Sequence, residues 1–207
     1  MRKHFGSSYL RRPASREPYD TVLIVCEGEK TEPNYFRDLM LTHRLSSANI
    51  VVVSPGADPV TLVEHARQRL ADFDRVYCVF DGDNAARAAH AADMIGTSAE
   101  GRAGKWHAIR STPCFEMWLL LHFKYSTAPF VKTGKLSPAD CAIAALKTHL
   151  PKYAKGHSGL YGRLSEKVVL AMANGRRLEK HNATTQSANP ATQVHNLVDY
   201  LRALKRD

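Results

Sequence analysis

The chain of 207 residues is long enough for one domain with its own hydrophobic core. It has no apolar run of the roughly 18 residues that span a membrane and no apolar stretch after its basic start, so we expect a cytoplasmic protein without membrane contact. Its four cysteines show no CxxC or Cys/His pairing and are expected to be reduced thiols. Residues 1–18 hold five Lys or Arg and one acid, residues 152–207 hold ten Lys or Arg and four acids, and residues 19–151 hold fourteen Lys or Arg and fifteen acids. The basic excess at the two ends favours nucleic acid as a partner; basic tails that are only solvated are the alternative.

The predicted elements begin after a basic arm at residues 1–18, which lacks hydrophobic periodicity and is expected to be flexible. Apolar runs of strand length then alternate with amphipathic or alanine-rich segments. The predicted strands are residues 21–26, 49–54, 75–81 and 105–111. The predicted helices that follow them are residues 32–45, 58–73, 84–95 and 113–123. This alternation predicts right-handed crossovers and an α/β fold with a mostly parallel, doubly wound sheet flanked by helices.

After about Tyr125 the strand signal stops, and the rest of the chain predicts helices. These helices are residues 137–150, 165–181 and 189–205. The last is expected to begin with Asn189 as its N-cap and Pro190 in its first turn. We therefore expect an α/β core at residues 19–125 and a helical C-terminal extension at residues 126–207 that packs on the core.

Carboxylates follow two of the predicted strands. Glu27 comes directly after the first strand, and Asp81 and Asp83 stand at the end of the third. Ligands of an open parallel sheet bind outside the carboxyl ends of its strands, so we expect these three side chains to share one edge. Like charges repel there unless a divalent cation neutralises them, and Mg²⁺ prefers oxygen ligands. The pattern predicts a site for Mg²⁺ or Mn²⁺; a surface Asp-Gly-Asp turn is the alternative for Asp81 and Asp83.

Four stretches carry a resemblance to a known family. They are LIVCEGEKTEPNYF (23–36), VFDGDN (79–84), STPCFEMWLLLHF (111–123) and NPATQVHNLVDYL (189–201). Each resembles a block of the RloB-like family, and Glu-Gly after one strand with Asp-x-Asp after a later one is similar to the Toprim domain of topoisomerases, primases and OLD-family nucleases. The resemblance implies a Toprim-like fold and Mg²⁺-dependent phosphodiester chemistry, with Glu27, Asp81 and Asp83 in the acidic positions. It also implies a phage-defence or restriction-linked system with a separate ATPase of the AAA or ABC type, and it leaves a homo-oligomer open.

Two further acids are candidates for the site. Glu32 lies five residues after Glu27, whereas OLD-like nucleases tend to place a second acid about four residues after the first. We include Glu32 as a metal ligand; a helix acid that interacts with the macrodipole is the alternative. Glu116 stands in an otherwise apolar segment, so it is expected either to face the site as a catalytic residue or to be buried beside a base such as Arg110.

Basic residues near the acids, and in or beside a later loop at residues 153–164, are candidates for nucleic-acid binding. They are Lys30, Lys152, Lys155 and Arg163. Lys30 is expected to contact a phosphate or to pair with the nearby acids. The later loop also contains Tyr153 and Tyr161, which would stack on bases if the loop binds a strand; an ordinary surface loop is the alternative.

The leading hypothesis is a metal-dependent endonuclease that acts on RNA or DNA. A non-catalytic nucleic-acid-binding or regulatory subunit with a Toprim fold is the second hypothesis. A phosphatase ranks last. Asp-x-Asp after a strand also resembles the nucleophile motif of the HAD family, but that motif normally continues as Asp-x-Asp-x-Thr/Val, whereas here Asp83 is followed by NAARAA. The Gly-Lys pairs at Gly104 and Gly134 lack the other residues of a Walker A motif, so ATP use by this chain is not expected.

Overall fold

The computed structural model describes residues 20–47 and 49–204. The predicted arm at residues 1–18 and the last residues of the chain lie outside the described residues. A single sheet has the strand order β2-β1-β3-β4-β5, with the first four strands parallel and β5 antiparallel to β4. The strands are β1 (Val22–Cys26), β2 (Ile50–Val53), β3 (Arg75–Asp81), β4 (Trp106–Thr112) and β5 (Ala191–Thr192). The expected mostly parallel α/β fold is confirmed.

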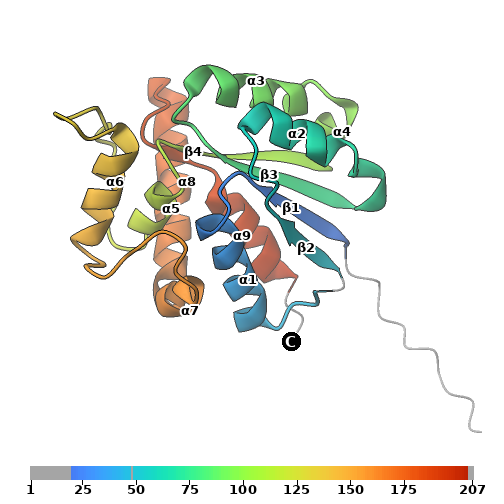
Figure 1. The fold of residues 1–207 in the computed structure, drawn as a ribbon, viewed down its shortest axis with the longest axis horizontal. Helices are drawn as coiled ribbons and strands as arrows, with labels where there is room; N and C mark the ends of the chain where they lie inside the picture. Colours follow the sequence, from blue (N-terminus) through green and yellow to red (C-terminus); the bar gives the residue numbers. More distant parts are fainter. Residues whose placement is uncertain (1–19, 48, 205–207) are drawn as a thin grey trace, which may run out of the picture.

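Helices cover both faces of the sheet (Figure 1). On one face lie α2 (Pro59–Arg67), the short 3₁₀ helix η1 (Leu70–Asp72), α3 (Ala85–Gly96) and α4 (Ala99–Arg102). On the other face and at one end of the sheet lie α1 (Thr31–His43), α5 (Glu116–Leu120), α6 (Pro138–Lys147), α7 (Leu160–Leu164), η2 (Ser165–Lys167), α8 (Val168–Thr185) and α9 (Val194–Ala203). The helices of the C-terminal extension pack on the core, because α7 contacts α1 and α6 contacts α5.

The central strand β1 explains why two hydrophobic layers form. Its side chains alternate between the faces, so Leu23 and Val25 enter the core under α2 and α3, while Val22, Ile24 and Cys26 enter the core under α1 and α9. All five are completely buried. A fully buried aliphatic side chain contributes about 1.5–3 kcal/mol, so a continuous apolar run is stable only between two covered faces.

Two helix starts follow the expected capping chemistry. The Asp58 side chain accepts a hydrogen bond from the Val60 N–H, and Pro59 occupies the first turn of α2. Ser137 and Asp140 form a reciprocal capping box at the start of α6. These local interactions place the amino ends of both helices where the sequence predicts them.

The predicted start of the last helix, at residue 189, is wrong. Asn189 does not cap a helix, because its side chain forms hydrogen bonds with both the N–H and the C=O of Phe130. The next residues form β5, and α9 begins only at Val194. An Asn-Pro pair suits a turn as well as a helix start, and the tertiary partner decides between them. The C-terminal extension therefore also supplies an edge strand of the sheet.

Two other predicted helices are shorter than expected. The segment at residues 113–123 is helical only over α5, and in the segment at residues 58–73 the α-helix ends at Arg67, before η1.

No helix among the described residues is long and apolar enough to cross a bilayer. All four cysteines are free thiols, and Cys141 is half-buried whereas the other three are buried.

The order of the strands creates a switch point between β1 and β3. From β1 the chain crosses to β2 on one side, and from β2 it returns past β1 to β3 on the other side. The crossovers on the two sides of this point run over opposite faces of the sheet, so the loops after β1 and β3 diverge there. Such a crevice at the carboxyl ends of the strands is where doubly wound sheets bind ligands.

Candidate functional site

Glu27 and Asp81 lie beside each other at the carboxyl ends of the two central strands. The Glu27 N–H donates to the Val79 carbonyl (2.9 Å), so the chain leaves β1 in register with β3. The Glu27 carboxylate turns back onto β3, where its Oε2 accepts a hydrogen bond from the Asp81 N–H (2.8 Å). Asp81 Oδ1 accepts another from the N–H of Phe115, just before α5 (2.9 Å). Three segments that are distant in the sequence are thereby joined at one edge.

A cavity of about 350 Å³ opens beside these two carboxylates, at the switch point. Its lining contains five carboxylates and two lysines. The lining residues are Glu27, Gly28, Glu29, Lys30, Thr31, Glu32, Asp81, Phe115, Glu116 and Lys155. The structure thus brings together most of the acids that the sequence singled out, and it leaves the cavity with an excess of negative charge.

Burial and mutual repulsion raise the pKa of acids in this cavity. For Asp81, burial is the largest cause and raises the pKa well above its ordinary value, and the carboxylates of Glu32 and Glu116 raise it further. Burial also raises the pKa of Glu27, although the hydrogen bond from the Asp81 N–H acts in the opposite direction. The negative charge is therefore poorly compensated, a condition that a bound cation relieves.

Glu32 belongs to this cavity although its spacing from Glu27 differs from the OLD-like pattern. It lies in the first turn of α1, is only 5% exposed, and has its pKa raised to about 7, chiefly by burial and then by Glu116. The carboxylate passes directly over Gly28, where an added Cβ would lie 2.0 Å from Glu32 Oε2. A glycine at position 28 is what allows this approach.

Glu116 is the first residue of α5 and faces the same cavity while being only 2% exposed. Its Oε1 accepts a hydrogen bond from the Tyr153 hydroxyl (2.7 Å). The base beside it is Lys155, with Nζ 4.0 Å from the same oxygen, and not Arg110. Burial acts to lower the pKa of Lys155, but the carboxylates around it, Glu116 foremost, raise it above its ordinary value.

The loop that carries Lys155 comes from the C-terminal extension and is anchored to the start of α1. The Gly156 N–H donates to Thr31 Oγ1 (3.1 Å), and Asn34 Nδ2 donates to the Gly156 carbonyl (2.9 Å). Gly156 has a φ of +82°. A side chain is disfavoured there by this backbone conformation and by the nearby Lys30 side chain. The extension therefore builds one wall of the cavity, a contact that the sequence alone does not predict.

Other predicted residues lie outside this cavity. Asp83 is exposed, and its Oδ1 accepts a hydrogen bond from the Asn84 N–H (2.7 Å). It is near enough to raise the pKa of both Glu27 and Asp81, so it lies at the rim. Lys152 and Arg163 are exposed and do not line the cavity, whereas Lys30 does.

The predicted base stacking by two tyrosines of the later loop is wrong. Tyr153 is 5% exposed and is directed at Glu116, and Tyr161 is completely buried. Tyr161 packs edge-on against Tyr35, with ring centroids 5.4 Å apart. Both rings are part of the hydrophobic core, because the extension folds over α1, so neither offers a free face to a base.

The donor set fits a magnesium ion, although within residues 20–47 and 49–204 no three His, Cys, Asp or Glu side chains are already arranged as a metal-binding group. Glu27 and Asp81 each use one carboxylate oxygen in a hydrogen bond with a backbone N–H. The second oxygen of each is available to a cation. Mg²⁺ usually takes one or two protein carboxylates and keeps several waters. Glu32 and Asp83 are further candidate ligands.

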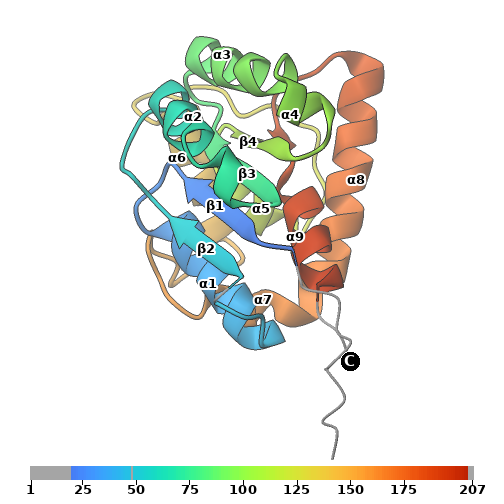
Figure 2. The ribbon, with the colours of Figure 1, turned by 90° about the vertical axis from the view of Figure 1, so that its right-hand side faces the viewer.

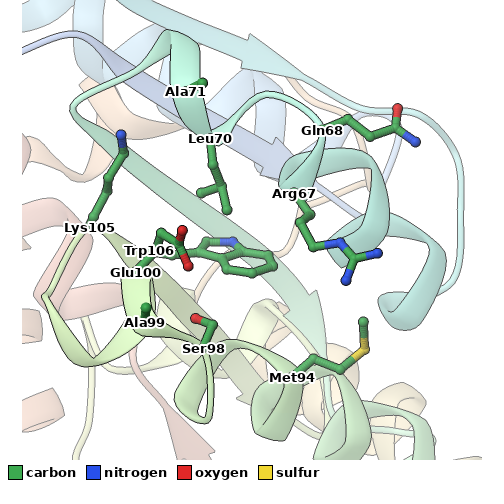
Figure 3. A pocket seen from close by; sticks show the side chains of 10 residues that line it. All are labelled: Arg67, Gln68, Leu70, Ala71, Met94, Ser98, Ala99, Glu100, Lys105 and Trp106. Carbon is green, nitrogen blue, oxygen red and sulfur yellow. The ribbon is translucent and has the colours of Figure 1, made fainter.

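A larger cavity, of about 680 Å³, lies at the opposite end of the sheet, near the amino ends of β3 and β4 (Figure 3). Leu70, Met94 and Trp106 contribute apolar surface to it, and Glu100 is the only carboxylate among the described residues that line it. Its chemistry differs from that of the acidic cavity, so the larger volume does not identify it as the place of the predicted metal chemistry.

The fold and the acidic cavity define a doubly wound α/β protein with a carboxylate-rich site at the switch point of its sheet. The family described as RloB-like protein matches residues 22–201 of this chain. The chain therefore belongs to the RloB-like family, as the sequence blocks predict. Comparison with curated proteins and comparison with solved structures gave no match.

Proposed function

We propose that this protein is a Mg²⁺-dependent endonuclease that hydrolyses phosphodiester bonds of RNA or DNA, and that its sheet is Toprim-like. The observation that supports this most is the pairing of Glu27 and Asp81 on adjacent central strands, inside a cavity with three further carboxylates. Mn²⁺ is the expected substitute for Mg²⁺, since both accept carboxylate and water ligands.

The acids have distinct tasks in this proposal. Glu27 and Asp81 would hold the cation, and Glu32 and Asp83 would complete or adjust the site from the cavity wall and the rim. A bound Mg²⁺ supplies charge stabilisation for the phosphate and the leaving oxygen. Glu116, held by the Tyr153 hydroxyl at 2.7 Å, accepts a proton from the attacking water.

The bases bind the substrate backbone. Lys30 and Lys155 line the cavity and are placed to contact the phosphates next to the scissile bond. Lys152 and Arg163 are exposed outside it and extend the contact along the strand. Together with the basic ends of the chain they provide salt-dependent affinity for a polyanion.

The biological setting is part of the same proposal. RloB-like family membership supports a phage-defence or restriction-linked role in the cytoplasm, with a separate AAA- or ABC-type ATPase that controls the nuclease. The absence of a Walker A pattern in the sequence is consistent with ATP use by such a partner rather than by this chain. A homo-oligomer is compatible with the proposal.

A non-catalytic nucleic-acid-binding or regulatory subunit is the alternative. Its support is that Glu27 and Asp81 already bind backbone N–H groups of the fold, as purely structural carboxylates do. Incubation of the protein with plasmid, single-stranded DNA and tRNA in Mg²⁺ or Mn²⁺, with and without a candidate partner ATPase of the AAA or ABC type, separates the two. Metal-dependent cleavage that Asp81→Asn abolishes supports the nuclease. Nucleic-acid binding without cleavage under all these conditions supports the alternative.

A further inference from the structure

A short exposed hairpin precedes α6. The Thr133 N–H donates to the Leu136 carbonyl (3.1 Å), and the Leu136 N–H donates back to the Thr133 carbonyl (3.0 Å). Gly134 is the first residue of the turn and has a φ of +61°, as two-residue hairpin turns require. We call residues 131–136 the basic hairpin, because this segment contains no acid and two lysines, Lys132 and Lys135.

Both ends of the basic hairpin are fixed to the rest of the fold. Just before it, the N–H and the C=O of Phe130 form hydrogen bonds with the Asn189 side chain (3.2 and 2.7 Å). Just after it, Ser137 and Asp140 form the capping box of α6. The hairpin is therefore held in place before any partner binds, and a preorganised contact loses less entropy on binding.

The first turn of α6 connects the basic hairpin to the acidic cavity. The Cys114 thiol donates to the Ala139 carbonyl (3.9 Å), and Cys114 directly precedes Phe115, which lines the cavity. Lys135 stands four residues before Ala139, so the Cα atoms of the two residues are at most about 14 Å apart. The helix α6 lies to the left of the sheet in Figure 1 and behind it in Figure 2, at the end to which the parallel strands point. A nucleic-acid strand in the cavity therefore needs only a few more nucleotides to reach the hairpin.

The charge of the segment that contains the hairpin indicates the occupant. Residues 117–165 hold seven Lys or Arg and a single acid, Asp140. Hydrogen bonds in the capping box are the largest cause of the lowered pKa of Asp140, and the charge of Lys155 on the cavity wall lowers it further. Neither Lys132 nor Lys135 forms an ion pair with a residue that the structure describes. A polyanion that leaves the cavity on this side meets bases that have no acidic partner there.

Two apolar side chains of the basic hairpin are outside the hydrophobic core. Val131 and Leu136 are 59% and 46% exposed. Many proteins that bind nucleic acid place apolar side chains against the bases, next to Lys or Arg side chains at the phosphates. The basic hairpin presents the same combination on a fixed tip.

We propose that the basic hairpin binds the nucleic-acid strand that leaves the acidic cavity. Lys132 and Lys135 contact its phosphates, and the two apolar side chains contact its sugars or bases. The inference rests on the proposed function insofar as nucleic acid is the partner of the cavity, but it does not require that the protein cuts the strand. It adds a second contact a few nucleotides from Lys30 and Lys155.

Removal of the two lysine charges tests the phosphate contacts. The probe is a fluorescein-labelled single-stranded DNA of about 20 nucleotides, longer than ordinary single-strand sites. Its binding to the full-length protein is followed by fluorescence anisotropy at several salt concentrations, with Ca²⁺ in place of Mg²⁺. Lys132→Gln combined with Lys135→Gln should weaken binding about tenfold and reduce the slope of log K against log salt by about 1.4, since each contact on a single strand contributes about 0.7. Arg67→Gln combined with Arg102→Gln removes the same charge from exposed positions at the other end of the sheet and is the matched control.

Removal of the apolar side chains tests the other contact. Val131→Ser combined with Leu136→Ser should weaken binding severalfold and leave the salt slope unchanged, because apolar contacts release no counterions. Val169→Ser combined with Leu170→Ser changes another exposed apolar pair, at the start of α8, and is the control. Since all these side chains are exposed, the melting temperatures should stay near that of wild type.

The possible results separate this site from the proposed function. Strand binding that both hairpin variants weaken supports the site, even if the wild type cuts no substrate with Mg²⁺ and the nuclease proposal fails. Unchanged binding and salt slope in the lysine variant, or no strand binding by the wild type, would overturn the site, even if the protein cleaves nucleic acid. Binding to phosphatidylserine vesicles that the apolar variant loses, with strand binding unaffected, would assign the hairpin to a membrane surface and would also overturn the proposal.

Discussion

Asp81 donates its backbone N–H to Glu27 Oε2 at 2.8 Å, and this bond joins the ends of the two central strands. It directs one carboxylate onto the backbone of the next strand, so both acids face the same cavity. The Asp81 carboxylate is held in turn by the Phe115 N–H. Removing a charge here should therefore affect ion binding more than folding, because the backbone keeps the geometry.

Asp81→Asn tests the central part of the proposed function. The amide keeps an oxygen for the Phe115 N–H and removes a buried negative charge, so in metal-free buffer the melting temperature should equal or exceed that of wild type by a few degrees. Metal binding by calorimetry should weaken, and cleavage should fall by at least about 100-fold. Asp83→Asn is the rim control, with a smaller gain in stability because Asp83 is exposed. Wild-type cleavage by folded Asp81→Asn would contradict the metal site.

Tyr153→Phe tests whether the extension orients Glu116. The variant keeps the ring and removes the hydroxyl that bonds Glu116 Oε1, so the free energy of unfolding should fall by about 1–2 kcal/mol. In the proposed nuclease, kcat should fall more than KM changes, because the orientation of Glu116 is disturbed and the lysines of the cavity remain. Glu116→Gln and the double variant complete a cycle. Strictly additive effects in that cycle would show that the two side chains act independently.

Gly28→Ala tests the close approach of Glu32 to the loop after β1. An added Cβ would lie 2.0 Å from Glu32 Oε2, so the carboxylate must move away. We expect weaker binding of Mn²⁺ by calorimetry and a small change in melting temperature. Replacing Glu32 by alanine in the same chain should remove the strain, and Gly96→Ala, where the new Cβ meets no atom within 4 Å, is the control. Unchanged metal binding by Gly28→Ala would exclude Glu32 from the site.

His122 makes stability depend on pH. It is completely buried, and burial lowers its pKa to about 4, well below the ordinary value of about 6.5. The unfolded chain therefore binds a proton at higher pH than the folded chain, so this residue decreases stability as the pH falls from about 6.5 to 4. The total loss is up to roughly 3 kcal/mol.

His122→Asn tests this, because an asparagine amide can still donate to the Trp118 carbonyl that His122 Nδ1 contacts. Urea unfolding at several pH values should show a smaller loss of stability between pH 6.5 and pH 4 than in wild type. Parallel profiles for the two proteins would mean that other groups cause the acid sensitivity.

Deletion of residues 1–18 tests the role assigned to the basic amino-terminal segment. These residues hold five Lys or Arg and one acid. Each phosphate contact that is lost should reduce the slope of log K against log salt by about 0.9 on duplex DNA. We expect weaker and less salt-dependent binding with an unchanged melting temperature, measured by anisotropy at several salt concentrations. An unchanged slope would assign the affinity to the C-terminal bases instead.

Most of the α/β architecture could be predicted because its signals are local. The apolar runs at β1 and β3 are fully buried strands, and Asp58 and Ser137 cap helices in the way that their neighbours predict. The strand β5 could not be predicted, since two residues carry no periodicity and its partners are distant in the chain, as in the bond between Ser111 and Thr192, which are 81 positions apart. Asn189 illustrates the same limit. Its side chain could cap a helix, but it forms hydrogen bonds with the backbone of Phe130, which is distant in the chain.

The sequence by itself determined the family, the alternation of strands and helices, and the position of Glu27 and Asp81 at strand ends, because these depend on residue type and spacing along the chain. Only the tertiary structure decided which groups meet. It placed Glu32 over Gly28, selected Lys155 rather than Arg110 as the base beside Glu116, and used Tyr153 to hold that acid inside the fold. Such contacts are formed by segments more than thirty residues apart or by the turn of a loop, and the free energy that selects them comes from burial and hydrogen bonding in the assembled core.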